Sequence, residues 1–217
     1  MVIAELGRVE RTYSRLGRRW AWNVLSFAGF LGRESMIRKR AVEHLELRPG
    51  DAVLDVACGR GSNFPCLERA IGEEGRLVGT DYSRTMLTGA EALVRKRRWT
   101  NVTLVRQDAA EIAYNAEFDG AICTIALYVI PRWEEALTRM TAAVRPGRRL
   151  VIVDGKLGEG IGRIGNPYAR LFARIVAADL NRDILGACRT LLGDLREETL
   201  LFGTYFIVSG TPRATAG

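Results

Sequence analysis

Short apolar runs alternate with stretches of helical period through the middle of the chain. Five runs have the length and composition of strands covered on both faces, at 51–56, 75–81, 102–106, 118–124 and 149–154. Helical patterns lie before or between them, at 34–47, 63–72, 83–98 and 132–144. This alternation predicts an α/β fold built on a doubly wound parallel sheet.

The last third of the chain departs from this alternation. A glycine-rich stretch at 158–165 predicts a flexible loop, and helical patterns follow at 168–180 and 183–193. Two further apolar runs, at 195–201 and 204–209, predict two more strands. We therefore expect one domain over 49–217, with a helical insertion at about 157–193 that forms a second wall of a substrate site.

Residues 1–48 contain an apolar segment at 20–31 that has arginines at both ends. It is too short to cross a membrane, which takes about 20 apolar residues, and charges such as Glu5 and Arg8 interrupt any secretory signal. The segment fits either a helical lid over a substrate cleft or a helix lying on a membrane surface, and a lipid substrate would satisfy both. His44, the only histidine, lies in the next helical pattern, and we interpret it as structural.

The stretch 51–65 joins a buried strand, a glycine turn and the start of a helix. Gly59 and Gly61 allow the backbone to turn sharply and a ligand to approach it closely. Ser62 or Asn63 can cap the helix, whose positive end then points into the turn and suits an anionic group. The turn lacks the lysine of a nucleoside triphosphate loop, and Phe64 replaces the third glycine of a dinucleotide motif.

Acidic residues follow the predicted strands. Asp55 lies just before the glycine turn, and Asp81 ends the next strand, 26 residues further on. An acid at that strand tip can accept hydrogen bonds from both hydroxyls of a ribose. The alternatives are that Asp81 only caps the following helix and that Asp108, after the third strand, is a solvent-facing loop acid.

The charge of the chain leaves its partners open. It has 32 basic and 25 acidic residues, a net charge of +7, and all but three of the basic residues are arginines. This excess favours contact with an anionic surface, either nucleic acid or anionic lipid. The four cysteines lack the spacing of a metal site, so we expect no metal and reduced thiols in a cytoplasmic protein.

The motif D-x-A-C-G-x-G at 55–61 resembles the first motif of the class I S-adenosylmethionine-dependent methyltransferases. The run 81–87 is similar to the D-x-S-x-x-M-L pattern of the same family, and 145–147 reads R-P-G, as in its typical turn. The resemblance covers about 45–155 by motif and the rest by order of elements. It implies a mostly parallel seven-stranded sheet closed by an antiparallel pair, and S-adenosylmethionine as cofactor.

The resemblance also implies which residues hold the cofactor. Asp81 would bind the ribose, Tyr82 and Met86 would pack near the adenine, and Asp108 would face the adenine amino group as an acceptor. The full set that we expect to bind the cofactor is Asp55, Ala57, Cys58, Gly59, Gly61, Asn63, Asp81, Tyr82, Met86, Gln107, Asp108, Ala109 and Thr124.

Within this family the chain most resembles the ubiquinone/menaquinone C-methyltransferases and the bacterial phospholipid N-methyltransferases. The shared features are Tyr13 in an N-terminal helix, the triplet at 63–65 and arginine-rich, apolar surroundings. The resemblance implies in-line methyl transfer to a small amphiphilic or lipid-like acceptor, either a phospholipid amine or a quinone- or phenol-type ring. Such transfer needs few catalytic side chains, and the candidates for proton transfer are Tyr13, Tyr128 and Asp154.

Other functions stay open at this stage. The alternatives are a basic RNA methyltransferase and a non-catalytic binding module of the same fold. Residues 126–128 read A-L-Y, where amino-methylating nucleic-acid enzymes of this fold often carry N/D-P-P-Y/F, which makes a nucleic acid the less favoured substrate. We expect a cytoplasmic location, with peripheral contact to the inner membrane face as an open question, and no oligomeric state is predicted.

Overall fold

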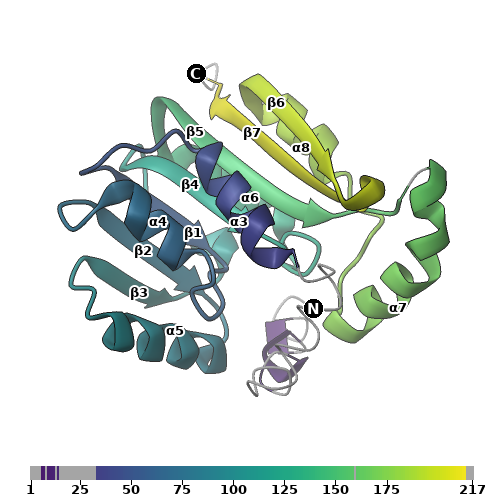
Figure 1. Ribbon diagram of the computed structural model, residues 1–217, viewed down its shortest axis with the longest axis horizontal. Helices are drawn as coiled ribbons and strands as arrows, with labels where there is room; N and C mark the ends of the chain where they lie inside the picture. The colour runs from purple at the N-terminus through teal and green to yellow at the C-terminus, as the bar shows by residue number, and fades with distance from the viewer. Residues whose placement is uncertain (1–5, 8, 13, 15–32, 159, 214–217) are drawn as a thin grey trace.

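A computed structural model describes residues 6–7, 9–12, 14, 33–158 and 160–213. Its centre is a seven-stranded sheet in the order β3-β2-β1-β4-β5-β7-β6 (Figure 1). The first five strands in this order are parallel, and β7 is antiparallel to both β5 and β6. This confirms the predicted mostly parallel sheet and its closing antiparallel pair. The strand bounds are β1 Ala52–Val56, β2 Arg76–Asp81, β3 Val102–Arg106, β4 Phe118–Thr124, β5 Val144–Gly155, β6 Leu192–Leu200 and β7 Tyr205–Pro212.

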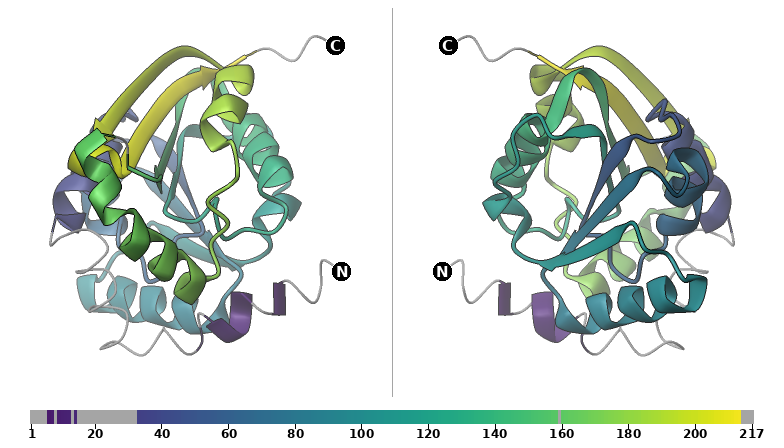
Figure 2. Two further views of the ribbon diagram at one scale, coloured as in Figure 1. Left: turned by 90° about the vertical axis from the view of Figure 1, so that its right-hand side faces the viewer. Right: turned by 90° about the vertical axis from the view of Figure 1, so that its left-hand side faces the viewer.

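Helices cover both faces of the sheet (Figure 2). One face packs against α3 (Glu34–Glu43), α4 (Phe64–Ile71) and α5 (Arg84–Arg97), and the other against α6 (Trp133–Ala143), α8 (Ile184–Leu191) and the 3₁₀ helix η1 (Ala109–Glu111).

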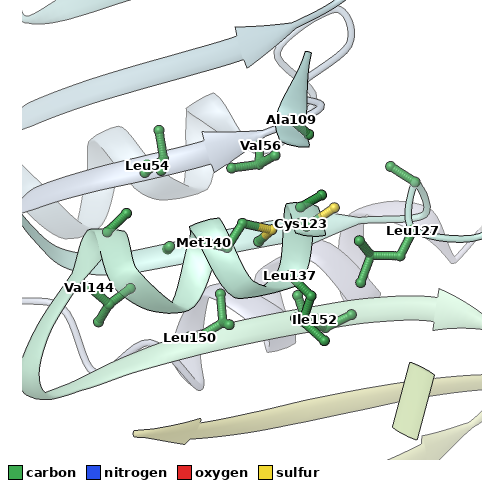
Figure 3. Close-up of a cluster of buried hydrophobic side chains, with 14 of the residues drawn as sticks. Leu54, Val56, Ala109, Cys123, Leu127, Leu137, Met140, Val144, Leu150 and Ile152 are labelled. Carbon is green, nitrogen blue, oxygen red and sulfur yellow. The ribbon is translucent and has the colours of Figure 1, made fainter. Parts of the chain in front are cut away.

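Alternate residues of a strand face opposite layers of this core. In β5, Leu150 and Ile152 pack under α6, as Figure 3 shows, whereas Val151 and Val153 belong to the other cluster. Because both sides are covered, the central strands read as continuous apolar runs, which is why the sequence locates them well.

Several element boundaries differ from the prediction. The helix predicted over 34–47 ends at Glu43. Residues 44–46 form a turn that buries Leu45 and in which Glu46 adopts a positive φ of 54°. The fifth strand was predicted at 149–154 but begins at Val144. The R-P-G residues 145–147 lie inside this strand, at a register shift opposite Phe118 and Gly120 in β4.

The region after β5 also differs from the prediction. Instead of an irregular loop over 158–165, the chain forms a 3₁₀ helix, η2, at Gly160–Gly165. The next helix, α7, spans Asn166–Val176 and not 168–180. It ends because Ala177 takes a left-handed conformation, after which the amide of Asp179 donates to the Tyr128 carbonyl at 2.8 Å. The strand predicted at 195–201 begins earlier, at Leu192, where α8 has ended.

His44 has structural partners, as we expected. Its Nδ1 lies 3.0 Å from Ser209 Oγ and its Nε2 lies 3.0 Å from Glu198 Oε2. Both partners belong to the β6–β7 pair, so the imidazole ties the end of α3 to that edge of the sheet. Cys58, Cys123 and Cys188 are free and buried. Within the described ranges, no helix is long and apolar enough to cross a membrane.

Candidate active site

A cavity of about 540 Å³ lies at the carboxyl ends of the parallel strands, where an open α/β sheet binds its ligands. Twelve of the residues that we expected to bind the cofactor or to transfer a proton line it: Ala57, Cys58, Gly59, Asp81, Tyr82, Met86, Gln107, Asp108, Ala109, Thr124, Tyr128 and Asp154. Asp55, Gly61 and Asn63 are not among its lining residues. Tyr13 and the segment 20–31 lie outside the described residues.

The glycine turn connects β1 to α4, and glycine is needed at each of its two positions for a different physical reason. A Cβ atom on Gly61 would lie 2.6 Å from Cδ2 of Phe64, so no larger residue fits under that ring. A Cβ atom on Gly59 would contact nothing within 4 Å, so glycine there keeps the backbone beside the cavity open. Phe64 fits in place of a third glycine because Gly79 in β2 also lacks a side chain, and a Cβ atom there would lie 2.7 Å from the ring.

A buried polar network lies beneath this turn. Asn63 Nδ2 donates to both carboxylate oxygens of Asp55 at 3.1 Å, so the expected cap by the Asn63 side chain does not form. Burial raises the pKa of Asp55 to about 7, although the Asn63 hydrogen bond and the nearby Arg38 charge lower it in part. Because Asp55 is fully buried, it positions the turn from below.

Arg38 was not singled out by the sequence. Its Nη1 donates to Asn63 Oδ1 at 2.8 Å and to Thr124 Oγ1 at 2.7 Å, and its Nε donates to Glu34 at 2.9 Å. Arg38 is buried, yet it lines the cavity. The available signal was a charged residue next to Ile37 on the apolar face of α3, where a charge needs a partner.

Asp81 ends β2 and faces the glycine turn. The amides of Gly59 and Ser83 each donate to one of its carboxylate oxygens at 2.8 Å. Ser83, and not Asp81, caps α5 by accepting from the amide of Met86. Burial raises the pKa of Asp81 to about 6, and the two backbone hydrogen bonds oppose that rise. Each oxygen keeps a lone pair for a hydroxyl group of a ligand.

The loop after β3 adds polar groups to the cavity. Asp108 caps η1 by accepting from the Ala110 amide at 3.0 Å, and Arg132 donates to its other oxygen at 2.7 Å. The sequence did not single out Arg132, which lies just before α6 and far from Asp108 in the chain. Gln107 Nε2 is buried and lacks a hydrogen-bond partner within the described part of the chain. Because Gln107 lines the cavity, a ligand acceptor would satisfy this donor.

The other end of the cavity holds Asp154, at the tip of β5. Gly155 N donates to one carboxylate oxygen at 2.9 Å, and Tyr128 N donates to the other at 3.4 Å. Burial raises the pKa of Asp154 to about 7, while these amides lower it in part. Burial also raises the pKa of the phenols of Tyr128 and Tyr205, which both line this end. Tyr205 escaped the sequence analysis because its strand reads only as an apolar run.

Comparison with known proteins agrees with this geometry. Residues 53–147 match a family model described as a methyltransferase domain. Demethylmenaquinone methyltransferase of Shouchella clausii is 28% identical over 134 residues, which is 61% of this chain and 57% of that protein. The residues that the family model matches include the glycine turn, Asp81 and Asp108. Residues 53–147 are therefore similar in sequence to methyltransferase domains, and the sheet has the class I S-adenosylmethionine-dependent methyltransferase fold.

Solved structures extend this fold over nearly the whole chain. A chain of the complex between the Haloferax volcanii Trm112 methyltransferase activator and a methyltransferase covers 96% of this chain and 99% of itself, with a TM-score of 0.76 at 15% identity. Phosphoethanolamine N-methyltransferase 2 of Haemonchus contortus with S-adenosyl-L-methionine covers 93% of this chain and 60% of itself, with a TM-score of 0.72 at 14% identity. The chain spans less than two thirds of the length of the first curated relatives it matches.

The residues that line the cavity fit the expected cofactor, S-adenosylmethionine. Asp81 offers acceptors, Gly59 exposes backbone, and Gln107 offers a buried donor that no described residue satisfies. Arg38 brings a positive charge to the same wall of the cavity, which suits a carboxylate group. S-adenosylmethionine is an amino acid joined to a nucleoside, and this combination of acceptors, donors and positive charge matches its groups.

Proposed function

We propose that the protein transfers a methyl group from S-adenosylmethionine to a small amphiphilic acceptor with a quinone- or phenol-type ring. One observation carries the proposal: a single cavity runs from the glycine turn and Asp81 to an apolar and aromatic end above Asp154. The first end suits a polar nucleoside. The second end suits a flat apolar ring that carries one ionisable group.

The aromatic end favours a ring acceptor over a simple amine. Tyr168 and Phe172 of α7 both line the cavity, and their rings stack with centroids 6.3 Å apart and an interplanar angle of 27°. Aromatic side chains bind flat rings by stacking and by burying apolar area. The name of the relatives, demethylmenaquinone methyltransferase, supports the same class of acceptor. A phospholipid amine is the other acceptor to test.

We propose that Asp154 is the general base. S-adenosylmethionine, when bound, supplies a methyl group on a positively charged sulfur. With a pKa of about 7, Asp154 is half ionised near neutral pH and can accept the proton of a ring hydroxyl. Tyr128 stays a neutral phenol, because its pKa is raised, and can donate a hydrogen bond to the acceptor. The apolar walls exclude water, which protects the methyl group from hydrolysis.

Residues 1–48 are proposed to close the cavity as a helical lid, and 157–193 to form its second wall. The described part of the first segment supports this division, because Leu6 and Val9 line the cavity. Ile164, Tyr168 and Phe172 of the second segment also line it.

The test is methyl transfer from labelled S-adenosylmethionine to separated extracts of quinones, phenols and phospholipids, with RNA as a further acceptor. We expect label in the quinone or phenol fraction, and loss of that label in Asp154→Asn. Label that appears only in phospholipid would replace the acceptor class, and label that appears only in RNA would reject the amphiphile altogether. No transfer by protein that binds the cofactor would contradict the proposed activity.

A further inference from the structure

An exposed apolar surface surrounds the mouth of the cavity. It comprises Ile164 of η2, three residues of α7 and Phe202 of the 3₁₀ helix η3 (Leu201–Gly203), and we call it the rim patch. The exposed fractions are 84% for Ile164, 48% for Tyr168, 57% for Leu171, 45% for Ile175 and 74% for Phe202. With one exception, Met36, these are all of the large exposed apolar side chains of the described residues. Such clustering marks an interaction surface.

The part of the rim patch that lies on η2 and α7 carries only positive charge. The sequence from 160 to 178 contains Arg163, Arg170 and Arg174 and no acidic residue. All three arginines are exposed, and none forms an ion pair with the described part of the chain. Unpaired arginines beside an apolar stripe complement an anionic surface.

Helix α7 arranges these residues in three strips along its length. Phe172, Ala173 and Val176 face the cavity. Leu171 and Ile175, four residues apart, form the outer apolar strip together with Tyr168. Arg170 and Arg174, also four residues apart, lie on the far side of that strip. The order of cavity, apolar strip and positive strip is that of a helix lying in a membrane interface.

The rim patch is continuous with the cavity. Ile164, Tyr168 and Phe202 are exposed and also line the cavity. Helix α7 stands away from the sheet, beyond the end of β5, as Figures 1 and 2 show. A surface that covers this patch would therefore also cover the mouth of the cavity.

We propose that the rim patch docks on the surface of an anionic lipid bilayer, so that an acceptor dissolved in the lipid enters the cavity without crossing water. This deepens the proposed function and rests on it for the nature of the acceptor. The docking itself needs only the patch and its arginines. It assigns the membrane contact to α7, η2 and η3, within the catalytic domain.

The test is co-sedimentation of the full chain with vesicles of phosphatidylcholine that contain about one third phosphatidylglycerol, against vesicles of phosphatidylcholine alone. The apolar variant is Leu171→Ser with Ile175→Ser, and its control is Met36→Ser, which changes an equally exposed apolar residue on α3. The charge variant is Arg170→Gln with Arg174→Gln. Its control, Arg97→Gln with Arg139→Gln, removes two exposed arginines from α5 and α6. None of these residues lines the cavity.

We expect the wild type to bind the anionic vesicles at low salt and to dissociate as the salt rises. Each rim variant should lower the partition coefficient by about tenfold or more, while the controls keep it within about twofold. Cofactor affinity should stay unchanged in all variants, which shows that they fold.

Three outcomes would overturn the docking surface. The first is equal vesicle binding by wild type and rim variants. The second is loss of binding only in Trp20→Ser with Trp22→Ser, which would assign the contact to the N-terminal segment. The third is a dimeric wild type that becomes monomeric in Leu171→Ser with Ile175→Ser, which would make the patch an interface between two copies. Vesicle binding without cofactor binding would instead reject the proposed function and leave the docking surface standing.

Discussion

Replacing Asp81 with alanine tests the position of the cofactor site directly. The carboxylate keeps one free lone pair on each oxygen after accepting from Gly59 and Ser83. Two hydrogen bonds from ribose hydroxyls to a charged acceptor contribute about 1.5 kcal/mol or more each. The variant should therefore lose at least about 3 kcal/mol of binding free energy, which is roughly a hundredfold in Kd.

Isothermal titration with S-adenosylmethionine at pH 8, where Asp81 is ionised, measures this loss. Asp154→Asn is the matched control, because it changes a second cavity carboxyl at the opposite end and should keep the affinity within about threefold. The pKa of Asp81 is about 6, so wild-type affinity should also fall as the pH drops below 6 and the carboxylate takes up a proton. An Asp81→Ala protein that binds within threefold of the wild type would refute our assignment of this acid to the ribose.

Three further predictions follow from single positions. Gly61→Ala should lower the free energy of unfolding in urea by about 2 kcal/mol or more, because it adds overlap with the Phe64 ring to an unfavourable positive φ. Gly59→Ala should lower it by only about 1 kcal/mol but weaken cofactor binding more than Gly61→Ala does. A larger loss of stability in Gly59→Ala, with a smaller loss of affinity, would contradict the two roles. Asp55, with its pKa raised to about 7, stabilises the fold fully below about pH 4, and this contribution of up to about 4 kcal/mol is lost as the pH rises through 7. Urea unfolding of the cofactor-free protein measures the difference in unfolding free energy between pH 5 and pH 8, which should be smaller in Asp55→Asn than in the wild type. An equal difference in both proteins would mean that Asp55 does not cause this pH dependence. If Asp154 is the base, kcat/KM should rise with pH, with an apparent pKa of about 7. Asp154→Asn should lower kcat/KM by about a hundredfold or more and remove its dependence on pH. An Asp154→Asn protein whose kcat/KM still rises with pH would exclude this role.

The central sheet was predictable because its strands are covered on both faces. The strand at 118–124 was predicted to the residue, and β1, β2 and β3 to within one residue at either end. Burial on both sides leaves continuous apolar runs, and turn residues mark their ends. This rule does not predict where β5 begins. The register shift at Phe118 and Gly120 allows the R-P-G residues 145–147, which are typical of a turn, to lie inside the strand.

The ends of the helices depended on distant contacts and were predicted less well. Leu180 continues the apolar pattern of α7, but the chain leaves the helix at Ala177, and the Tyr128 carbonyl then accepts from Asp179. Leu180 reaches the cavity wall from this turn. Helical periodicity shows that a residue is buried, but not whether a helix or a turn buries it.

The site followed from the sequence where one short segment contains both the geometry and the chemistry. Gly59 and Asp81 are such cases, since each lies at a strand end that the pattern locates. Arg38 and Tyr205, which line the cavity, and Arg132, which donates to Asp108, were missed. Each comes from an element whose place around the sheet is set by tertiary packing. The place of Arg38 on the apolar face of α3 indicates burial, but it does not show which residues the guanidinium contacts.

The three buried carboxyls at the strand tips have similar surroundings but different roles. Burial raises the pKa of Asp55, Asp81 and Asp154 alike, and amide groups hold each of them in place. Asp55 meets only protein and positions Asn63 and Arg38, whereas Asp81 and Asp154 line the cavity at opposite ends. Because amides oppose the rise at both cavity carboxyls, each can carry its charge near neutral pH, one to hold a ligand and the other to accept a proton. The access that each tip has to the cavity, and not its ionisation alone, therefore determines its role.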